Sequence, residues 1–262
     1  GAEGLQQSRS YAERVEEVST SDATFLQDVL MQRERAIAWC SVCYAAAQLG
    51  GAEGFRQSLS YAERVEEVST SETTFLQDVK MQSQRAEAWR SVCYAAAQLG
   101  GAEGFQQSLS YAERVEEVTT SDATFLQDVE MQKERAAAWR HVCYAACKLG
   151  GAEGFQQSLP YAERVEEVST SESFFLQDVG IQEERAVAWL QVASAAVGLQ
   201  GEQWPVVVRQ YAQKALDIVD AAEAFSTSPW LQETRAKALL LLEESQENGQ
   251  LEENALDWSE LS

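Results

Sequence analysis

The sequence is poor in proline, histidine and basic side chains, and it has no long run of apolar residues. Three prolines in 262 residues suit a helical chain. A single histidine leaves no Ser-His-Asp or Cys-His set that could recur through the chain. Without a run of about 18 apolar residues, no membrane-spanning helix is expected. Acidic residues outnumber basic ones by 42 to 20, a net charge of −22. Because nucleic-acid affinity rests on cations that neutralise phosphates, this balance disfavours DNA or RNA as a partner.

Cysteine usage suggests a compartment. The five cysteines are an odd number without the spacing of a disulfide framework, which favours a reducing environment. We therefore predict a cytoplasmic protein, and we expect no cofactor. The chain starts with Gly1 inside a repeat and without an initiator Met, so it looks like a fragment whose N-terminal targeting signal is beyond judgement.

The main feature of the sequence is a repeat with a period of 50 residues. Four copies align without gaps, and a divergent fifth copy, in which Tyr211 falls on Tyr161, keeps the register before an acidic tail. A unit this short cannot bury its apolar face alone, so neighbouring units must stack. We predict an all-α fold, an α-solenoid of stacked antiparallel helix pairs. Its segments are residues 1–50, 51–100, 101–150, 151–200, 201–245 (a divergent capping repeat) and 246–262 (an acidic tail or capping helix).

Each repeat carries two amphipathic patterns. In the second copy, apolar residues recur at three- and four-residue steps from Phe55 to Val68 and again from Ala86 to Leu99. The glycine pair that begins at Gly100 would form a left-handed turn into the next repeat.

The position of the break between the two helices is less obvious. The Ser-Thr-Ser run that ends at Ser71 could form a loop. In the fifth copy, however, Ser228-Pro229 aligns with Asp178-Val179 and is typical of an N-cap followed by the first helical residue. We therefore predict helices at about 53–76 and 79–99 in the second copy. The predicted breaks lie at Asp28, Asp78, Asp128 and Asp178.

One motif carries a family resemblance. Trp89-x-x-Val92-Cys93-x-x-Ala96-x-x-Leu99-Gly100 places a Trp, an aliphatic residue three positions on and a Leu-Gly pair as in tetratricopeptide-like repeats, and a small residue, Ala112, follows in the next helix. The chain resembles that superfamily of helical-hairpin repeats. The resemblance implies a protein- or peptide-binding scaffold without catalysis.

The copies differ mainly along one stripe of the second helix. Its positions are 30, 33, 37, 40, 41 and 48 of the first copy and their equivalents. At 100° per residue they span an arc of about 100°, opposite Trp39, Val42 and Ala46. Relaxed drift on a solvated face is one explanation, but Gln57, Glu63, Arg64, Glu66 and Glu67 of the first helix are the same in all four full copies.

We favour the hypothesis that the stripe was diversified for target choice. Tyrosines on the same arc could anchor a partner or pack between repeats. Basic side chains outnumber acidic ones on the stripe, which suits an acidic or mixed-charge peptide. The residues predicted to contact the partner are Arg33, Ile37, Cys40, Tyr44, Lys80, Glu87, Arg90, Tyr94, Gln98, Glu130, Lys133, Arg140, His141, Tyr144, Lys148, Glu183, Leu190 and Gln191.

Other candidate sites have simpler explanations. His141 is one variant of a variable position, and the cysteines lack the four-ligand arrangement of a closed zinc site, so no metal is expected. Cys43, Cys93 and Cys143 are more simply small buried hydrophobes. The glycines before each first helix lack the Lys of a P-loop, and the glutamates of Ala62–Val68 are typical of a solvating face. The tryptophans Trp39, Trp89, Trp139 and Trp189 are predicted to form a buried ladder between repeats.

The two ends differ. The fifth copy has Leu239 in place of the repeated tryptophan, as expected of a terminal repeat. The tail, with Leu251, Leu256 and Trp258, could be a capping helix or a linear motif that docks on a partner. The first copy shows no such adaptation, so its apolar face would be exposed. Either this end was cut from a longer array or it supports end-to-end association. A structural array that self-associates in this way, without another ligand, is the alternative to a binding scaffold; an enzyme is least favoured.

Overall fold

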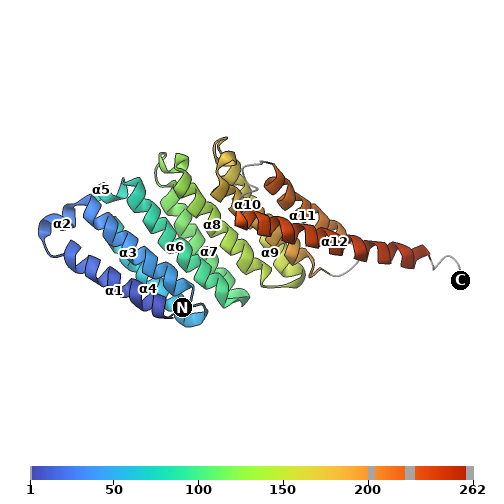
Figure 1. Cartoon of the computed structure of the whole chain (residues 1–262), viewed down its shortest axis with the longest axis horizontal. Coiled ribbons are helices and arrows are strands. Elements are labelled where there is room, and N and C mark those ends of the chain that lie inside the picture. The colour runs from blue at the N-terminus through green and yellow to red at the C-terminus, as the bar shows by residue number, and fades with distance from the viewer. Residues whose placement is uncertain (1, 200–203, 222–227, 258–262) are drawn as a thin grey trace. The chain divides into compact units, whose positions relative to one another are not determined.

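The computed structural model describes the backbone of residues 2–199, 204–221 and 228–257, with side chains as far as residue 246, and this part of the chain is helical throughout apart from short turns. It contains two compact units, Gly1–Val142 and Cys143–Ser262. Within each unit, consecutive helix pairs stack in the order of the sequence, and in the first unit they run from blue to green in Figure 1. The predicted all-α array of 50-residue repeats is confirmed.

Each repeat contributes one helix before the break and one after it. The first helices of the five repeats are α1 (Ala2–Ser19), α4 (Gly51–Thr70), α7 (Gly101–Thr120), α9 (Gly151–Thr170) and α11 (Trp204–Asp220). The second helices are α3 (Val29–Ala47), α6 (Val79–Leu99), α8 (Val129–Cys147), α10 (Val179–Ala196) and α12 (Pro229–Asp257). Short turns between them are α2 (Ala23–Gln27), α5 (Thr73–Leu76), η1 (Phe125–Gln127) and η2 (Phe175–Gln177).

The predicted break before each second helix is confirmed. The carboxylate of Asp78 accepts a hydrogen bond from the backbone N–H of Met81 at 2.8 Å, and Asp178 caps α10 in the same way. In the fifth repeat the hydroxyl of Ser228 takes over this role, with its oxygen 3.4 Å from the N–H of Leu231. These side chains satisfy N–H groups that the first turn of a helix leaves without a partner.

The first helix is shorter than predicted. It ends at Thr70 rather than near residue 76, and the single turn α5 follows. The hydroxyl of Ser71 donates to the carbonyl of Val68 at 3.0 Å, and such side-chain bonds offer the backbone an alternative to continuing the helix. The Ser-Thr-Ser run therefore does end the first helix, and the Asp break is a second one.

A buried glutamine fastens the short turn to the helix pair. The side-chain amide of Gln82 donates to the carbonyls of Ser69, at 3.0 Å, and Phe75, at 2.9 Å. Both Gln82 and the ring of Phe75 are buried. The glutamine recurs in each of the four full copies, and in each it donates to the same carbonyl of the turn.

Glycines shape the passage from one repeat to the next. Gly100 and Gly101 have φ angles of +73° and +63°, which confirms the predicted turn. Gly104, in the first turns of α7, lies so close to α6 that an added Cβ would meet the carbonyl oxygen of Ala96 at 2.8 Å. The repeated glycines therefore allow a tight turn and a close approach of two helices.

The C-terminal tail does not begin a separate helix. As far as Asp257 it continues α12, which starts at Pro229, so the predicted short capping helix is instead an extension of the fifth repeat. The side chains of Leu251 and Leu256, and all of Trp258 and Leu261, lie outside the described residues. None of the helices in the described ranges is long and apolar enough to cross a membrane.

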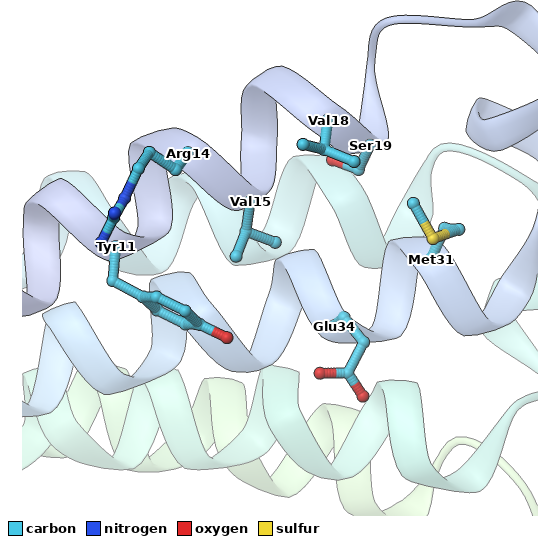
Figure 2. A pocket seen from close by; sticks show the side chains of 7 residues that line it. All are labelled: Tyr11, Arg14, Val15, Val18, Ser19, Met31 and Glu34. Atoms are coloured by element: carbon cyan, nitrogen blue, oxygen red, sulfur yellow. The ribbon is translucent and has the colours of Figure 1, made fainter.

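The N-terminal face of the first unit is open, as predicted. Val15 and Val18 of α1 and Met31 of α3 line a hollow on this face (Figure 2). Val18 is exposed, whereas the equivalent Val68 is buried.

Candidate functional site

The tryptophans form the predicted buried ladder. The ring of Trp89 stacks on that of Tyr111 in the next repeat, with centroids 5.8 Å apart and planes at 5°, and the guanidinium of Arg114 lies 4.0 Å from its centroid. Trp39 is held by the equivalent pair, Tyr61 and Arg64. Each of these seams between repeats thus clasps an indole between an aromatic ring and a cation.

The same clasp occurs in the second unit. Trp189 stacks on Tyr211 at 5.6 Å, and the ammonium of Lys214 lies 3.6 Å from the ring centroid. The cation changes from Arg to Lys, but the arrangement is kept. The clasp is therefore a property of the seam between repeats and not of one repeat.

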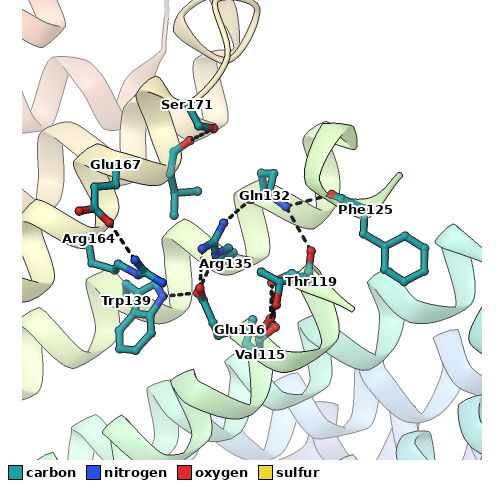
Figure 3. Close-up of polar contacts among 12 residues, drawn as sticks. Val115, Glu116, Thr119, Phe125, Gln132, Arg135, Trp139, Arg164, Glu167 and Ser171 are labelled. Carbon is teal, nitrogen blue, oxygen red and sulfur yellow. Dashed lines mark hydrogen bonds and ion pairs between the residues drawn. The ribbon is translucent and has the colours of Figure 1, made fainter. Parts of the chain in front are cut away.

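A glutamate accepts a hydrogen bond from the indole of Trp89, Trp139 and Trp189, but not from that of Trp39. Glu66 accepts hydrogen bonds from the indole of Trp89 at 2.7 Å and from the guanidinium of Arg85 at 2.6 Å. Burial raises the pKa of Glu66, but the bonds from Arg85 and Trp89 outweigh it and lower the pKa overall. Figure 3 shows the same arrangement around Glu116. The expectation that these glutamates only solvate the helix face is therefore wrong for Glu66.

These contacts give a structural role to two of the residues that are identical in all four full copies. Arg64 and Glu66 both make contacts that support the seam, so a structural role accounts for their identity in the copies as well as resistance to drift would. Their invariance cannot serve as evidence that the variable stripe was diversified for a target.

Three of the residues predicted to contact a partner lie in the interior. Cys40, His141 and Leu190 are buried, so the prediction that these side chains contact a partner is wrong for the chain in this conformation. The ring of His141 packs against that of Tyr94, with centroids 5.0 Å apart. Burial, and next the charges of Arg140 and Arg90, lower the pKa of His141 well below its ordinary value. The reason in each case is the neighbouring repeat, which covers this edge of the second helix.

Other variable residues form polar contacts with the next repeat. Arg33 pairs with Asp78 at 2.7 Å, and Arg90 pairs with Glu134. Burial raises the pKa of Glu134, although Arg90 opposes this. All four side chains are mostly covered. Part of the stripe therefore lies in the seam between repeats and not on one water-facing ridge.

The seam partners also differ from repeat to repeat in a matched way. Where α10 carries Glu183 in place of Arg33, the next repeat has Ser228 in place of Asp78, and the serine hydroxyl donates to the glutamate. Likewise, α10 has Leu190 at the position equivalent to Arg90, and the fifth repeat has Thr234 at the position equivalent to Glu134. Variation at these positions thus preserves complementarity between neighbours.

The remaining variable residues are accessible to different degrees. Those that are exposed are Ile37, Tyr44, Lys80, Glu130 and Lys148. Those that are partly exposed are Arg33, Glu87, Arg90, Tyr94, Gln98, Lys133, Arg140, Tyr144, Glu183 and Gln191.

The tyrosines divide between the two predicted roles. Tyr94 packs between repeats, against His141. Tyr44 is half exposed. The second repeat has the small Ser91 at the position of His141, so Tyr44 has no ring to pack against there. The ammonium of Lys148 lies 4.4 Å from the ring centroid of Tyr144.

A groove of about 310 Å³ crosses the N-terminal halves of α3, α6 and α8 in the first unit. Four carboxylates and two cations line the groove, so its net charge is negative. The variable stripe as a whole, in contrast, is predicted to be mildly basic. Eight of its ten lining residues stand at positions that vary between the copies. The lining residues are Arg33, Ile37, Val79, Lys80, Ser83, Gln84, Glu87, Asp128, Glu130 and Glu134.

The reactive side chains are poorly placed for chemistry. Burial raises the pKa of Cys43, and it raises the pKa of Cys93 to about 12, so both thiols stay protonated. Both are buried, as is Cys143, in agreement with their predicted packing role. Within the described ranges, no three His, Cys, Asp or Glu side chains converge as a metal site would require.

No protein-family model matches the chain, and no curated protein or solved structure is similar to it. The structure establishes an all-helical tandem array of helix pairs with a period of 50 residues.

Proposed function

We propose that this protein is a non-catalytic scaffold of tetratricopeptide-like type that binds a protein or peptide in the groove across α3, α6 and α8. The observation that carries the proposal is that the groove collects accessible side chains at positions where the repeats differ, among them Ile37, Lys80 and Glu130. Seam contacts account for Arg33 and Arg90, but not for these three. The free cysteines support a reducing, cytoplasmic setting.

The charges of the groove favour a mixed-charge extended segment. On the α8 side, Asp128 and Glu130 offer carboxylates to a basic residue of the partner. On the α6 side, Lys80 is exposed and can meet an acidic one. Such a pattern sets direction and register more than affinity, because rim charges are screened by water and salt. The overall charge of −22 continues to disfavour nucleic acid.

The test uses fluorescence anisotropy with labelled peptides of equal length whose net charge runs from negative to positive. We expect the mixed-charge peptides to bind and Glu130→Lys and Lys80→Glu to weaken them. The control is Glu117→Lys, an exposed change on α7 outside the groove. Binding that is unchanged in both groove variants, or lost equally in the control, would refute the groove as the site.

The second candidate function is a structural array that associates end to end. The exposed Val18 on the open N-terminal face favours it. Sedimentation of the chain alone distinguishes the two functions, since the array requires an average mass that rises with concentration.

A further inference from the structure

Two arginines distinguish the first helices of the first two repeats from those of the other full copies. Arg9 of α1 stands where the other three full copies have leucine, and Arg56 of α4 stands where they have glutamine. Within the first helices of the four full copies, these are the positions at which charge differs. Although they belong to different repeats, both arginines line one hollow between α1 and α4. The differences in charge on the first helices therefore converge at one place.

This hollow is basic, although the chain as a whole is acidic. It has a volume of about 280 Å³, and three arginines and one glutamate line it, so that its excess charge is positive. These charged residues are Arg9, Arg56, Arg64 and Glu13. The equivalent positions between α4 and α7 hold one arginine, Arg114, and one glutamate, so the charges balance there. The basic character thus belongs to the seam between the first and second repeats.

The third arginine is already held in place beside the hollow. The guanidinium of Arg64 lies 4.4 Å from the ring centroid of Trp39 and 3.2 Å from a carboxylate oxygen of Glu16. The ring of Tyr61, which also lines the hollow, stacks on the same indole with centroids 5.7 Å apart. Because both side chains are fixed against a buried ring, this part of the hollow is preorganised for a ligand.

The two distinguishing arginines contribute little to the helices that carry them. Arg9 pairs with Glu13 at 2.9 Å and Arg56 pairs with Glu53 at 2.5 Å, and all four side chains are at least half exposed. Exposed pairs within one helix add little to stability. The other copies form the same first helix with leucine and glutamine at these positions. The fold therefore does not require either arginine, and their guanidinium groups can turn to a ligand.

A phosphoryl group matches this arrangement of donors. It carries a charge of about −1.5 to −2 at neutral pH and three acceptor oxygens, and a guanidinium donates paired N–H bonds to such oxygens. Ser60 and Tyr61 add hydroxyl donors to the lining. A carboxylate offers one charge and two oxygens, so it would leave part of the excess positive charge without a partner.

The size of the hollow and the charge of the whole chain indicate what carries the phosphoryl group. Pockets that enclose a small molecule measure about 300–1,000 Å³, so a hollow of about 280 Å³ suits one side chain of a longer ligand. Nucleic acid or an anionic membrane would bring many negative charges against a chain of net charge −22. A peptide with one phosphorylated side chain avoids most of that repulsion, since charges beyond about 8 Å are screened at physiological ionic strength.

We propose that the hollow between α1 and α4 binds a phosphorylated serine, threonine or tyrosine side chain of a partner peptide. Arg9, Arg56 and Arg64 donate to the phosphoryl oxygens, and phosphorylation of the partner decides whether it binds. The hollow shares no lining residue with the groove across α3, α6 and α8, so this site is independent of the function proposed for that groove.

The test follows the side-chain Nε–H signals of arginine by NMR in an isotope-labelled chain. The probe is a short glycine-alanine peptide with one central phosphoserine, and the same peptide with serine is its control. We expect the phosphopeptide to shift the signals of Arg9, Arg56 and Arg64 to saturation. Arg9→Leu with Arg56→Gln copies the residues of the third repeat and should weaken binding at least about tenfold, with Arg64 as the remaining reporter.

A charge-matched control removes two cations from the second helices instead. Lys80→Gln with Lys133→Gln lowers the net charge by the same amount but leaves the hollow intact. Phosphopeptide binding should be unchanged in this variant. Because Lys80 lines the groove, the control also separates this site from the groove.

A second variant rebuilds the site in the neighbouring seam. Leu59→Arg and Gln106→Arg, added to the chain that lacks Arg9 and Arg56, place two arginines at the equivalent positions, with Arg114 at that of Arg64. Phosphopeptide binding should return, and the signal of Arg114 should now shift. Circular dichroism identifies which variants are folded.

Binding that requires the phosphoryl group, is lost without Arg9 and Arg56 and returns in the rebuilt seam would support the proposal. Equal binding of the serine peptide, an absence of saturable shifts at Arg64, or a folded rebuilt variant that does not bind would overturn it. An equal loss in the lysine control would overturn it as well, because net charge would then explain the binding. Inorganic phosphate that binds more tightly than the phosphopeptide would also overturn it, since the ligand would then be a free ion.

Discussion

Trp39 and Trp89 provide a matched comparison of the same indole with and without its hydrogen bond. Both rings are buried. Trp39 lies between Tyr61 and Arg64. Trp89 lies in the same way between Tyr111 and Arg114. The indole N–H of Trp89 donates to a carboxylate at 2.7 Å, whereas that of Trp39 is buried and meets no acceptor among the described residues.

Replacement by phenylalanine isolates that difference. Both Trp39→Phe and Trp89→Phe remove similar ring area. Only the second removes a hydrogen bond to a charged acceptor, worth about 1.5–3 kcal/mol, and the first also removes an N–H without a partner. We therefore expect Trp89→Phe to reduce the free energy of unfolding by at least about 1.5–3 kcal/mol more than Trp39→Phe. That difference is large against a total stability of about 5–15 kcal/mol.

Urea unfolding followed by circular dichroism measures the two losses. Amide hydrogen exchange in α3 and α6 accompanies it, because repeat arrays need not unfold in a single step. The controls are Trp39→Ala and Trp89→Ala, each expected to cost about 3–5 kcal/mol from the cavity. Equal losses for the two phenylalanine variants, or a larger loss at Trp39, would refute the role assigned to the glutamate.

Three further predictions concern the seams. Because bonds from arginine and tryptophan lower the pKa of Glu66, its contribution is complete above the unfolded pKa of about 4.5 and is lost as the pH falls through the folded pKa, so urea midpoints should decline in that acidic window. Gly104→Ala should lower the melting temperature, since its Cβ would lie 2.8 Å from a carbonyl oxygen, while Gly4→Ala, with open space around it, should raise stability by up to about 1 kcal/mol. Arg90→Leu should cost about 3–5 kcal/mol by leaving the Glu134 carboxylate buried without its partner. Adding Glu134→Thr should recover most of that loss in the same urea assay, and no recovery would contradict the matched-pair explanation.

The repeat, the helix pairs and the tryptophan ladder could be predicted because each is written in local periodicity. The break at Asp78 could be predicted as well, since an N-cap has its own signature. The end of α4 at Thr70 does not follow from comparison with the fifth copy, because that copy lacks the Ser-Thr-Ser run. Hydroxyl groups bond to the preceding turn in the four full copies, whereas the fifth copy has Asp220 and Ala221 at these positions.

The stripe could not be placed from one helix alone. A helical wheel gives the direction of a side chain but not what packs against it, and each second helix in a stack touches its own partner and both neighbouring repeats. Polar residues such as Arg90 therefore look solvated when they are paired 44 residues further along. A signal was present: Arg90 is followed by Glu134, and Leu190 by Thr234, at the same spacing.

The 44-residue spacing distinguishes two kinds of variable position within the stripe. Positions whose changes are matched in the next repeat, such as Arg90 with Glu134, specify which repeats can be neighbours, because a mismatch would bury an unpaired charge. Positions whose changes are unmatched and accessible, such as Lys80 and Glu130, have no such constraint, and these are the positions that the proposed groove would use. On the proposed function, the order of the array and the choice of a partner would be determined by different positions of the same helix. Selection on one set of positions need not disturb the other, and a change of partner would leave the seams intact.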